Sequence, residues 1–140
     1  MYGDSEDLIG RWFRANPDKR KDIFLATKFC TPIGHLPPGT PVEVYKAAVE
    51  SSLGRLGTDY VDIYMSHAVN NVARLQSDEW REFTALAKQQ GKIRFTGMLG
   101  HGGHLIECLD YAIDHDLVDA LGHPGQHFAG PALDHMRDTF

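Results

Sequence analysis

Residues 51–67 have the sequence SSLGRLGTDYVDIYMSH, and this stretch decides the fold class. Its first half completes an apolar helix face made of Val42, Tyr45, Val49, Leu53 and Leu56. Gly57 follows at the point where a left-handed residue would end that helix. The second half, Tyr60–His67, is predicted to be a strand. The stretch therefore predicts a helix followed closely by a strand, and the same alternation recurs on both sides of it.

Two further elements are predicted on the N-terminal side. Ser5 is expected to cap a helix that ends at Asn16–Pro17. The apolar face of this helix is expected to consist of Leu8, Ile9, Trp12 and Phe13. The run Ile23–Phe29 is nearly all apolar, which is typical of a strand in a parallel sheet buried on both faces.

A loop and a helix start follow this strand. The segment Cys30–Gly39 holds three prolines and two glycines, so it is predicted to be irregular. The next helix is expected to begin with Thr40 as its N-cap, Pro41 in the first position and Glu43 completing a capping box.

The C-terminal side continues the pattern. Ser77 is predicted to cap a helix through Trp80, Phe83 and Leu86 that Gly91 ends, and Ile93–Leu99 to form a strand. A helix with Leu105, Ile106, Leu109 and Ile113 comes next, and Leu117–Leu121 is expected to begin a fourth strand. Alternating strands and helices predict an α/β fold with a parallel sheet and right-handed crossovers.

Composition excludes several classes of protein. The chain has 140 residues, 42% of them hydrophobic and 24% charged, as in ordinary globular domains. Acidic side chains outnumber basic ones by 19 to 14, and the one basic cluster, Lys19–Lys21, is expected to be a solvated loop. No nucleic-acid partner and no membrane span are therefore predicted. The start lacks signal-peptide character and the two cysteines form no framework, so the cytoplasm is the expected compartment.

Three reactive side chains fall at predicted strand ends. In α/β sheets, chemistry gathers where strands end at their carboxyl edge. Lys28 and His67 end two of the strands, and Tyr2 would end a strand before the first helix. A lysine beside a tyrosine lowers the pKa of the phenol, and a histidine can hold a carbonyl oxygen. The competing interpretation is that Lys28 simply reaches solvent and His67 is an ordinary strand-end residue.

Four motifs resemble the aldo-keto reductase family, in order and over Tyr2 to about Leu121. They are Tyr2–Glu6 (YGDSE), Ile23–Phe29 (IFLATKF), Ser51–Tyr64 (SSLGRLGTDYVDIY) and Gln90–Gly97 (QGKIRFTG). The resemblance implies a (β/α)₈ TIM barrel that reduces aldehydes or ketones with NADPH. By matching motifs it implies Tyr2 as proton donor, Lys28 as the cation that lowers the tyrosine pKa, and His67 as the residue that orients the carbonyl.

The resemblance also locates the cofactor and sets the extent of the barrel. Leu99 and Gly100 stand where the family commonly has Ser-Asn against the nicotinamide, and His101 follows them in a Gly-His-Gly variant. The family's aspartate, five residues before the tyrosine, would precede Met1. Residues 1–121 are thus expected to form about half of a barrel, and residues 122–140 a divergent tail rich in Gly, Pro and His.

Two functional hypotheses remain at this point. One is NADPH-dependent reduction of a small carbonyl substrate at Tyr2, Lys28 and His67. The alternative is a non-catalytic barrel fragment that acts through assembly with a partner or with itself, because the open barrel edges favour self-association.

Other readings of the same residues are weaker. The loop Gly100–Gly103 lacks the third glycine of a dinucleotide fingerprint, so a tight turn is expected there. His101, His104, His123 and His127 lack the converging ligands of a zinc site, so no metal is predicted. The remaining sulfur-containing and aromatic side chains are expected to pack in the core, namely Cys30, Cys108, Trp12, Trp80, Phe83, Met65 and Met98.

Overall fold

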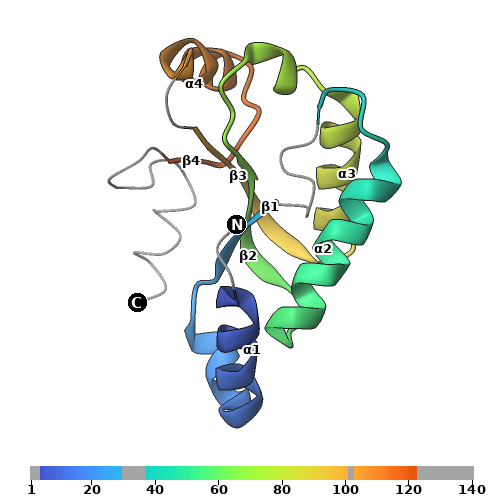
Figure 1. Ribbon diagram of the computed structural model, residues 1–140, viewed down its shortest axis with the longest axis vertical. Coiled ribbons are helices and arrows are strands. Elements are labelled where there is room, and N and C mark those ends of the chain that lie inside the picture. The colour runs from blue at the N-terminus through green and yellow to red at the C-terminus, as the bar shows by residue number, and fades with distance from the viewer. Residues whose placement is uncertain (1–3, 30–36, 101–102, 123–140) are drawn as a thin grey trace.

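The computed structural model describes residues 4–29, 37–100 and 103–122, and its centre is a four-stranded sheet (Figure 1). The strands are β1 (Ala26–Phe29), β2 (Val61–His67), β3 (Ile93–Leu99) and β4 (Ala120–Gly122). They lie in the order β1-β2-β3-β4, and every neighbouring pair is parallel. This confirms the predicted α/β class and the parallel sheet, and it fits part of a (β/α)₈ barrel.

Helices precede and connect the strands. They are α1 (Ser5–Ala15), α2 (Val42–Leu56), α3 (Asp78–Gln89) and α4 (Leu105–Asp114), with 3₁₀ turns η1 (Pro17–Asp22) and η2 (Val72–Arg74). Figure 1 shows α2 and α3 together on one side of the sheet, with α1 and α4 at opposite ends of the molecule. No helix among the described residues is both long and apolar enough to cross a membrane.

The strand register separates the two faces of the sheet. Lys28, Met65, Gly97 and Ala120 form one row of paired residues. Because side chains alternate along a strand, Ile63, Met65 and His67 share one face and Tyr64 lies on the other. Ile63 and Met65 pack with Phe24 and Phe95, whereas Tyr64 belongs to the main core under α2 and α3. The described sheet therefore has one helix-covered face and one inner face.

The α2–β2 junction matches the sequence prediction. Four of the five expected α2 face residues are buried, and Val42 packs against the same cluster. Gly57 has a φ of 65°, and its N–H donates to the carbonyl of Leu53 as the helix ends. Ser77 also caps α3 as predicted, since its hydroxyl accepts the N–H of Trp80. Trp80, Phe83, Met65, Met98 and Cys108 are all buried, as expected.

Two predicted helix caps are wrong. Ser5 is the first residue of α1 and Asp4 takes the cap position, without a side-chain bond. Thr40 does not cap α2, because its hydroxyl donates to the carbonyl of Pro37 at 2.7 Å instead. Glu43 pairs with Lys46 rather than completing a capping box. A threonine hydroxyl can donate a hydrogen bond to a carbonyl in the preceding turn instead of accepting one from the first turn of the helix, and Thr40 does so.

The predicted apolar faces of the two outer helices are only partly correct: Phe13 of α1 is buried, and Leu105 and Leu109 of α4 pack against the core. Leu8, Ile9 and Trp12 of α1 are exposed, Trp12 at 46%, and so are Ile106 and Ile113 of α4. In α1 the buried side carries Gly10 and Phe13. A Cβ on Gly10 would overlap the Arg55 carbonyl, so the glycine allows α1 to lie directly against α2. Leu8, Ile9 and Trp12 consequently point away from α2.

Two strands are shorter than predicted. The run Ile23–Phe29 forms a regular strand only from Ala26, and Ala26 itself is exposed rather than buried. The fourth strand begins at Ala120, so Leu117–Asp119 precede it. Both are the outermost strands of the described sheet, where pairing is confined to one neighbour.

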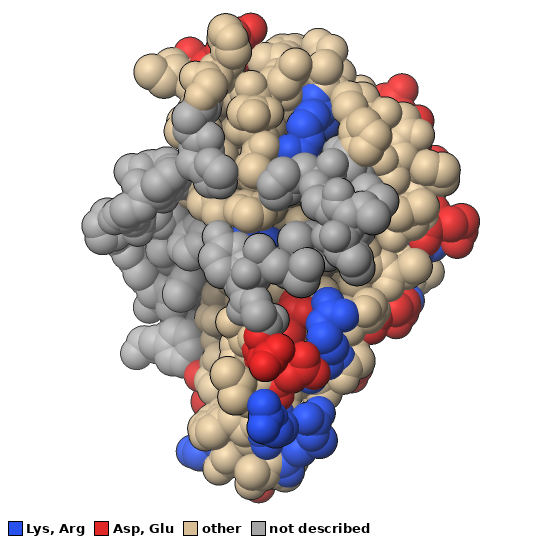
Figure 2. Space-filling view, in the orientation of Figure 1, with Lys and Arg blue, Asp and Glu red and all other residues tan. Residues whose placement is uncertain are grey.

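Arg20 is not part of a solvated loop. Its guanidinium donates to the Asp62 carboxylate at 3.0 Å and to the backbone carbonyls of Ile23 and Tyr60. The Asp62 side chain is only 2% exposed. Its carboxylate also accepts hydrogen bonds from the Arg94 guanidinium at 2.8 Å and from the Leu25 N–H at 2.8 Å. This cluster ties η1, β2 and β3 together at the amino ends of the strands. Elsewhere, on the face shown in Figure 2, basic and acidic side chains lie interspersed.

Asp119 fastens the start of β4 to β3. Its Oδ2 accepts hydrogen bonds from the Thr96 N–H at 2.7 Å, the Thr96 hydroxyl at 2.8 Å and the Lys88 ammonium at 2.7 Å. Burial acts to raise the pKa of Asp119, but the hydrogen bonds from Lys88 and Thr96 outweigh it and hold the pKa below its ordinary 3.8. The ionised carboxylate is thus the form that stabilises this link.

We expect Asp119→Asn to be about 1–2 kcal/mol less stable than the wild type near neutral pH, because it loses the charged acceptor. The folded-state pKa lies below the unfolded one, so this contribution is present above pH 3.8 and disappears as the pH falls through the folded pKa. Urea unfolding at about pH 7 and about pH 3 measures it. The gap between the two proteins should narrow at the lower pH, and an equal gap at both would contradict the assignment.

Candidate active site

Lys28 and His67 lie at the carboxyl ends of neighbouring strands and on the same face of the sheet. Lys28 pairs with Met65 in the register, and His67 follows two residues later on β2. Strand spacing and rise place their Cα atoms roughly 8 Å apart. Lys28 is half-buried and His67 is 8% exposed. A long cationic side chain and an imidazole thus lie on the same inner face, at the same edge of the sheet.

The strand that carries Lys28 is anchored beside it. The Thr27 hydroxyl donates to Glu6 Oε1 at 2.6 Å, and Arg55 donates from Nε to Glu6 Oε2 at 2.7 Å. Glu6 belongs to α1 and Arg55 to α2, so the two helices hold β1 from its outer side. Thr27 points opposite to Lys28 because they are adjacent in the strand. Sequence reasoning included Glu6 only as the last residue of the Tyr2–Glu6 motif, since its partners lie 21 and 49 residues away.

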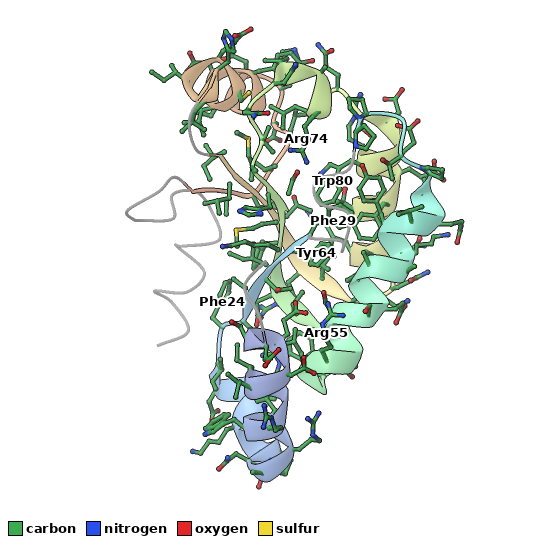
Figure 3. The ribbon with its side chains drawn as sticks, in the orientation of Figure 1. Phe24, Phe29, Arg55, Tyr64, Arg74 and Trp80 are labelled. Carbon is green, nitrogen blue, oxygen red and sulfur yellow. The ribbon has the colours of Figure 1, made fainter. Side chains whose placement is uncertain are left out.

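The turn after His67 has its own support. Ala68 has a φ of 52°, and the Val69 N–H donates to the Leu99 carbonyl at 3.1 Å. Arg74 donates from Nη1 to the carbonyl oxygens of His67 and Ala68. Figure 3 shows Arg74 above Trp80 and Phe29, near the carboxyl end of the sheet. No sequence motif includes Arg74, so its contacts emerge only from the folded turn.

The cofactor positions predicted on β3 lie next to His67. Leu99 ends β3, pairs with His67 in the register and is half-buried on the inner face. Gly100 is buried, and its N–H donates to the Gly122 carbonyl at 3.4 Å. A Cβ at Gly100 would overlap the Leu105 side chain and the Val69 carbonyl. The glycine therefore allows the end of β3, the start of α4 and the turn after β2 to pack closely together. Tyr2 and His101 lie outside the described residues.

No metal centre or reactive thiol is found in residues 4–29, 37–100 and 103–122. Within them, no three His, Cys, Asp or Glu side chains converge to hold a metal ion. Burial and the neighbouring Glu107 raise the pKa of the Cys108 thiol, which keeps it protonated in the core. Cys30, His123 and His127 belong to the undescribed segments.

Comparisons with known proteins give a consistent result. Residues 1–117 match the model of the aldo/keto reductase family. The chain is 39% identical over 101 residues to the aldo-keto reductase str7 of Strobilurus tenacellus, covering 70% of this chain and 28% of that protein. It is 35% identical over 103 residues to the NADP(+)-designated aldo-keto reductase yakc of Schizosaccharomyces pombe, covering 69% and 29%.

A third relative has a more specific name. Methylglyoxal reductase DkgA of Yersinia pestis is 32% identical over 107 residues, covering 76% of this chain and 35% of that protein. The chain therefore spans about a third of the length of these curated relatives.

Proposed function

Because the chain belongs to the aldo/keto reductase family, we propose that it reduces an aldehyde or ketone to an alcohol with NADPH at a site formed by Tyr2, Lys28 and His67. The observation that carries the proposal is the placement of Lys28 and His67 on one face, at the carboxyl ends of adjacent strands. Relatives named for NADP(+) and for methylglyoxal reduction support the cofactor and the small carbonyl substrate.

The proposed reaction gives each residue a distinct task. NADPH, when bound, supplies a hydride to the carbonyl carbon. His67 donates a hydrogen bond to the carbonyl oxygen and fixes its direction. The Tyr2 hydroxyl gives its proton to the same oxygen as negative charge develops there, and the Lys28 ammonium stabilises the phenolate that remains. Solvent returns the proton to Tyr2, so the sum is one hydride and one proton added across the C=O bond.

The end of β3 suits the reactive end of the cofactor. Leu99 offers an apolar surface directly beside His67, and Gly100 follows it at the same edge of the sheet. We assign Leu99, Gly100 and His101 to cofactor binding and residues 1–121 to the barrel unit, with 122–140 as a tail of divergent sequence. A cytoplasmic location is proposed because the buried Cys108 is a free thiol, the state that compartment maintains.

The test is oxidation of NADPH by the purified chain in the presence of a reactive aldehyde, with Tyr2→Phe as the matched control. Loss of the phenolic proton donor is expected to lower kcat by roughly 10²-fold or more, since positioned proton transfer contributes about that much. NADPH binding, followed by quenching of protein fluorescence, should be retained in Tyr2→Phe. Equal rates for the two proteins, or no turnover and no binding in either, would contradict the proposal.

We also propose that the chain self-associates, which is one of the two forms of assembly in the alternative function, the other being assembly with a partner. Among the described residues, β1 pairs only with β2 and β4 only with β3, so the sheet has two open edges. The helices nearest these edges, α1 and α4, carry five of the six large apolar side chains that are exposed in the described part of the chain. They lie at opposite ends of the molecule (Figure 1), so one copy can present its α1 to the α4 of another. Joining two four-stranded sheets in this way would give eight parallel strands.

Sedimentation equilibrium tests the self-association. Trp12→Lys on α1 should shift the chain towards monomer, because it places a charge in the apolar contact. Val44→Lys is the matched control, since Val44 is an exposed apolar residue on α2, away from both edges. A wild-type chain that remains a folded monomer at high concentration would refute this second function without affecting the first.

A further inference from the structure

Arg74 closes the turn that follows β2. The strand ends at His67, Ala68 adopts a left-handed conformation, and η2 brings the chain back. From η2 the guanidinium donates through Nη1 to the carbonyl oxygen of His67 at 3.1 Å and to that of Ala68 at 2.8 Å. One side chain thus joins the last residue of the strand to the first residue of the turn.

The two bonded carbonyls flank a single Cα atom. The His67 carbonyl belongs to the peptide plane before Ala68, and the Ala68 carbonyl to the plane after it. Holding both planes fixes the φ and ψ of Ala68, a non-glycine residue for which a left-handed conformation is unfavourable. The second plane is also held from its other side, because the Val69 N–H donates to the Leu99 carbonyl at 3.1 Å. Arg74 and β3 together therefore determine how the chain leaves His67.

The surroundings of Arg74 make a cation expensive there. Its side chain borders a small cavity lined by Phe29, Tyr45 and Trp80 on the helix-covered side of the sheet (Figure 3). Burial lowers the pKa of Arg74, because the charged guanidinium loses water in this position. No carboxylate of the described residues lies within ion-pair distance of it. A methionine would fill the same space without burying a charge. The distinctive contribution of arginine is therefore its pair of hydrogen bonds to the two carbonyl oxygens.

We propose that Arg74 is a positioning residue for His67, setting the direction of the imidazole through the two peptide planes on either side of Ala68. Arg74 lies on the face opposite the His67 side chain, so it acts through the backbone and does not contact the substrate. This inference rests on the proposed role of His67 in carbonyl reduction. The hold on the turn itself can be measured without any turnover.

The first experiment follows the His67 ring and the Val69 amide by NMR in the full 140-residue chain. Arg74→Met is expected to shift the ring signals of His67, assigned through His67→Gln, and to speed Val69 amide exchange about tenfold relative to Ile63 in mid-strand. Arg20→Met is the matched control, because Arg20 is also a half-buried arginine that bonds two backbone carbonyls, at the opposite ends of the strands. It should lower overall stability yet leave the His67 ring signals in place.

The second experiment separates positioning from stability by kinetics. In folded Arg74→Met, kcat for aldehyde reduction should fall tenfold or more while KM changes less than about threefold, because misdirection of a catalytic group affects the transition state most. Arg74→Lys should recover part of kcat, since an ammonium can still reach a carbonyl. Arg20→Met should keep kcat at the wild-type value once corrected for folded protein.

The outcomes distinguish this inference from the proposed function. If the His67 signals and Val69 exchange in Arg74→Met match the wild type, the positioning role is refuted, whatever the turnover. If they change as expected but the wild type neither binds nor oxidises NADPH, the positioning of the turn by Arg74 is supported and the proposed reductase function is refuted. Should Arg74→Met not fold, Arg74→Lys carries the test, and a His67 shift no larger than that in Arg20→Met overturns the inference.

Discussion

Replacing Lys28 by methionine is expected to lower kcat for carbonyl reduction by roughly 10²–10⁴-fold. The substitution keeps the length of the side chain and removes the one charge that β1 directs at the inner face near His67. In the proposed reaction, the negative charge left on Tyr2 after proton transfer would then lose its stabilising cation. Initial rates of NADPH oxidation over a range of aldehyde concentrations give kcat and KM separately.

Two comparisons make the Lys28 prediction specific. Lys46→Met removes a lysine from the outer helix α2, where it pairs with Glu43, and should leave kcat unchanged. A double variant with Tyr2→Phe should be hardly slower than the slower single variant, because residues that act as a unit have non-additive effects. Lys28 does not assist Tyr2 if Lys28→Met retains the wild-type kcat. The same conclusion follows if the fold-loss of kcat in the double variant equals the product of the fold-losses in the two single variants.

The largest effect on stability is expected at Asp62. Asp62→Ala should cost about 3–5 kcal/mol, because it leaves two guanidinium groups and a buried N–H without their shared acceptor. Arg20 and Arg94 contact opposite oxygens of this carboxylate, and the Leu25 N–H donates to it as well. A loss of that size is a large fraction of the total stability of a small domain.

Urea unfolding followed by circular dichroism measures the Asp62 effect. Asp78→Ala is the control, since Asp78 forms an exposed pair with Arg81 and should change stability by no more than about 0.5 kcal/mol. If Asp62→Ala is unfolded even without urea, Arg94→Met provides a milder disruption, because the Arg94 side chain is partly exposed. Equal stability of Asp62→Ala and Asp78→Ala would show that the cluster does not support the fold.

Local patterns in the sequence predicted most of the scaffold. The strand Ile93–Leu99, the buried face of α2 and the Ser77 cap all depend on residues within a few positions of one another. The placement of Lys28 and His67 at one edge of the sheet also follows from strand ends in a parallel sheet, whereas their shared face depends on the register. These features depend on neighbouring residues or on the period of a helix or strand, so they can be predicted without knowing which distant residues meet in the fold.

Features that depend on distant partners could not be predicted in this way. Arg20 appeared in a basic triplet, yet its buried partner Asp62 is 42 residues away. Trp12 has helical spacing with other apolar residues, but the close approach of Gly10 to Arg55 turns the opposite side of α1 inwards. Periodicity identifies an apolar stripe without saying which neighbour it meets. Arg74 is a similar case, since the turn that returns it to His67 has no motif.

The location of the Asp62 cluster also bears on how this protein can change over evolution. Its ion pairs bind the amino ends of the strands, whereas Lys28, His67 and Leu99 stand at the carboxyl ends. For the proposed reductase, substitutions that retune substrate choice at the carboxyl rim would leave the stabilising contacts of the Asp62 cluster at the amino rim intact. Such a separation allows new specificities to accumulate under selection without first requiring compensating, stabilising mutations.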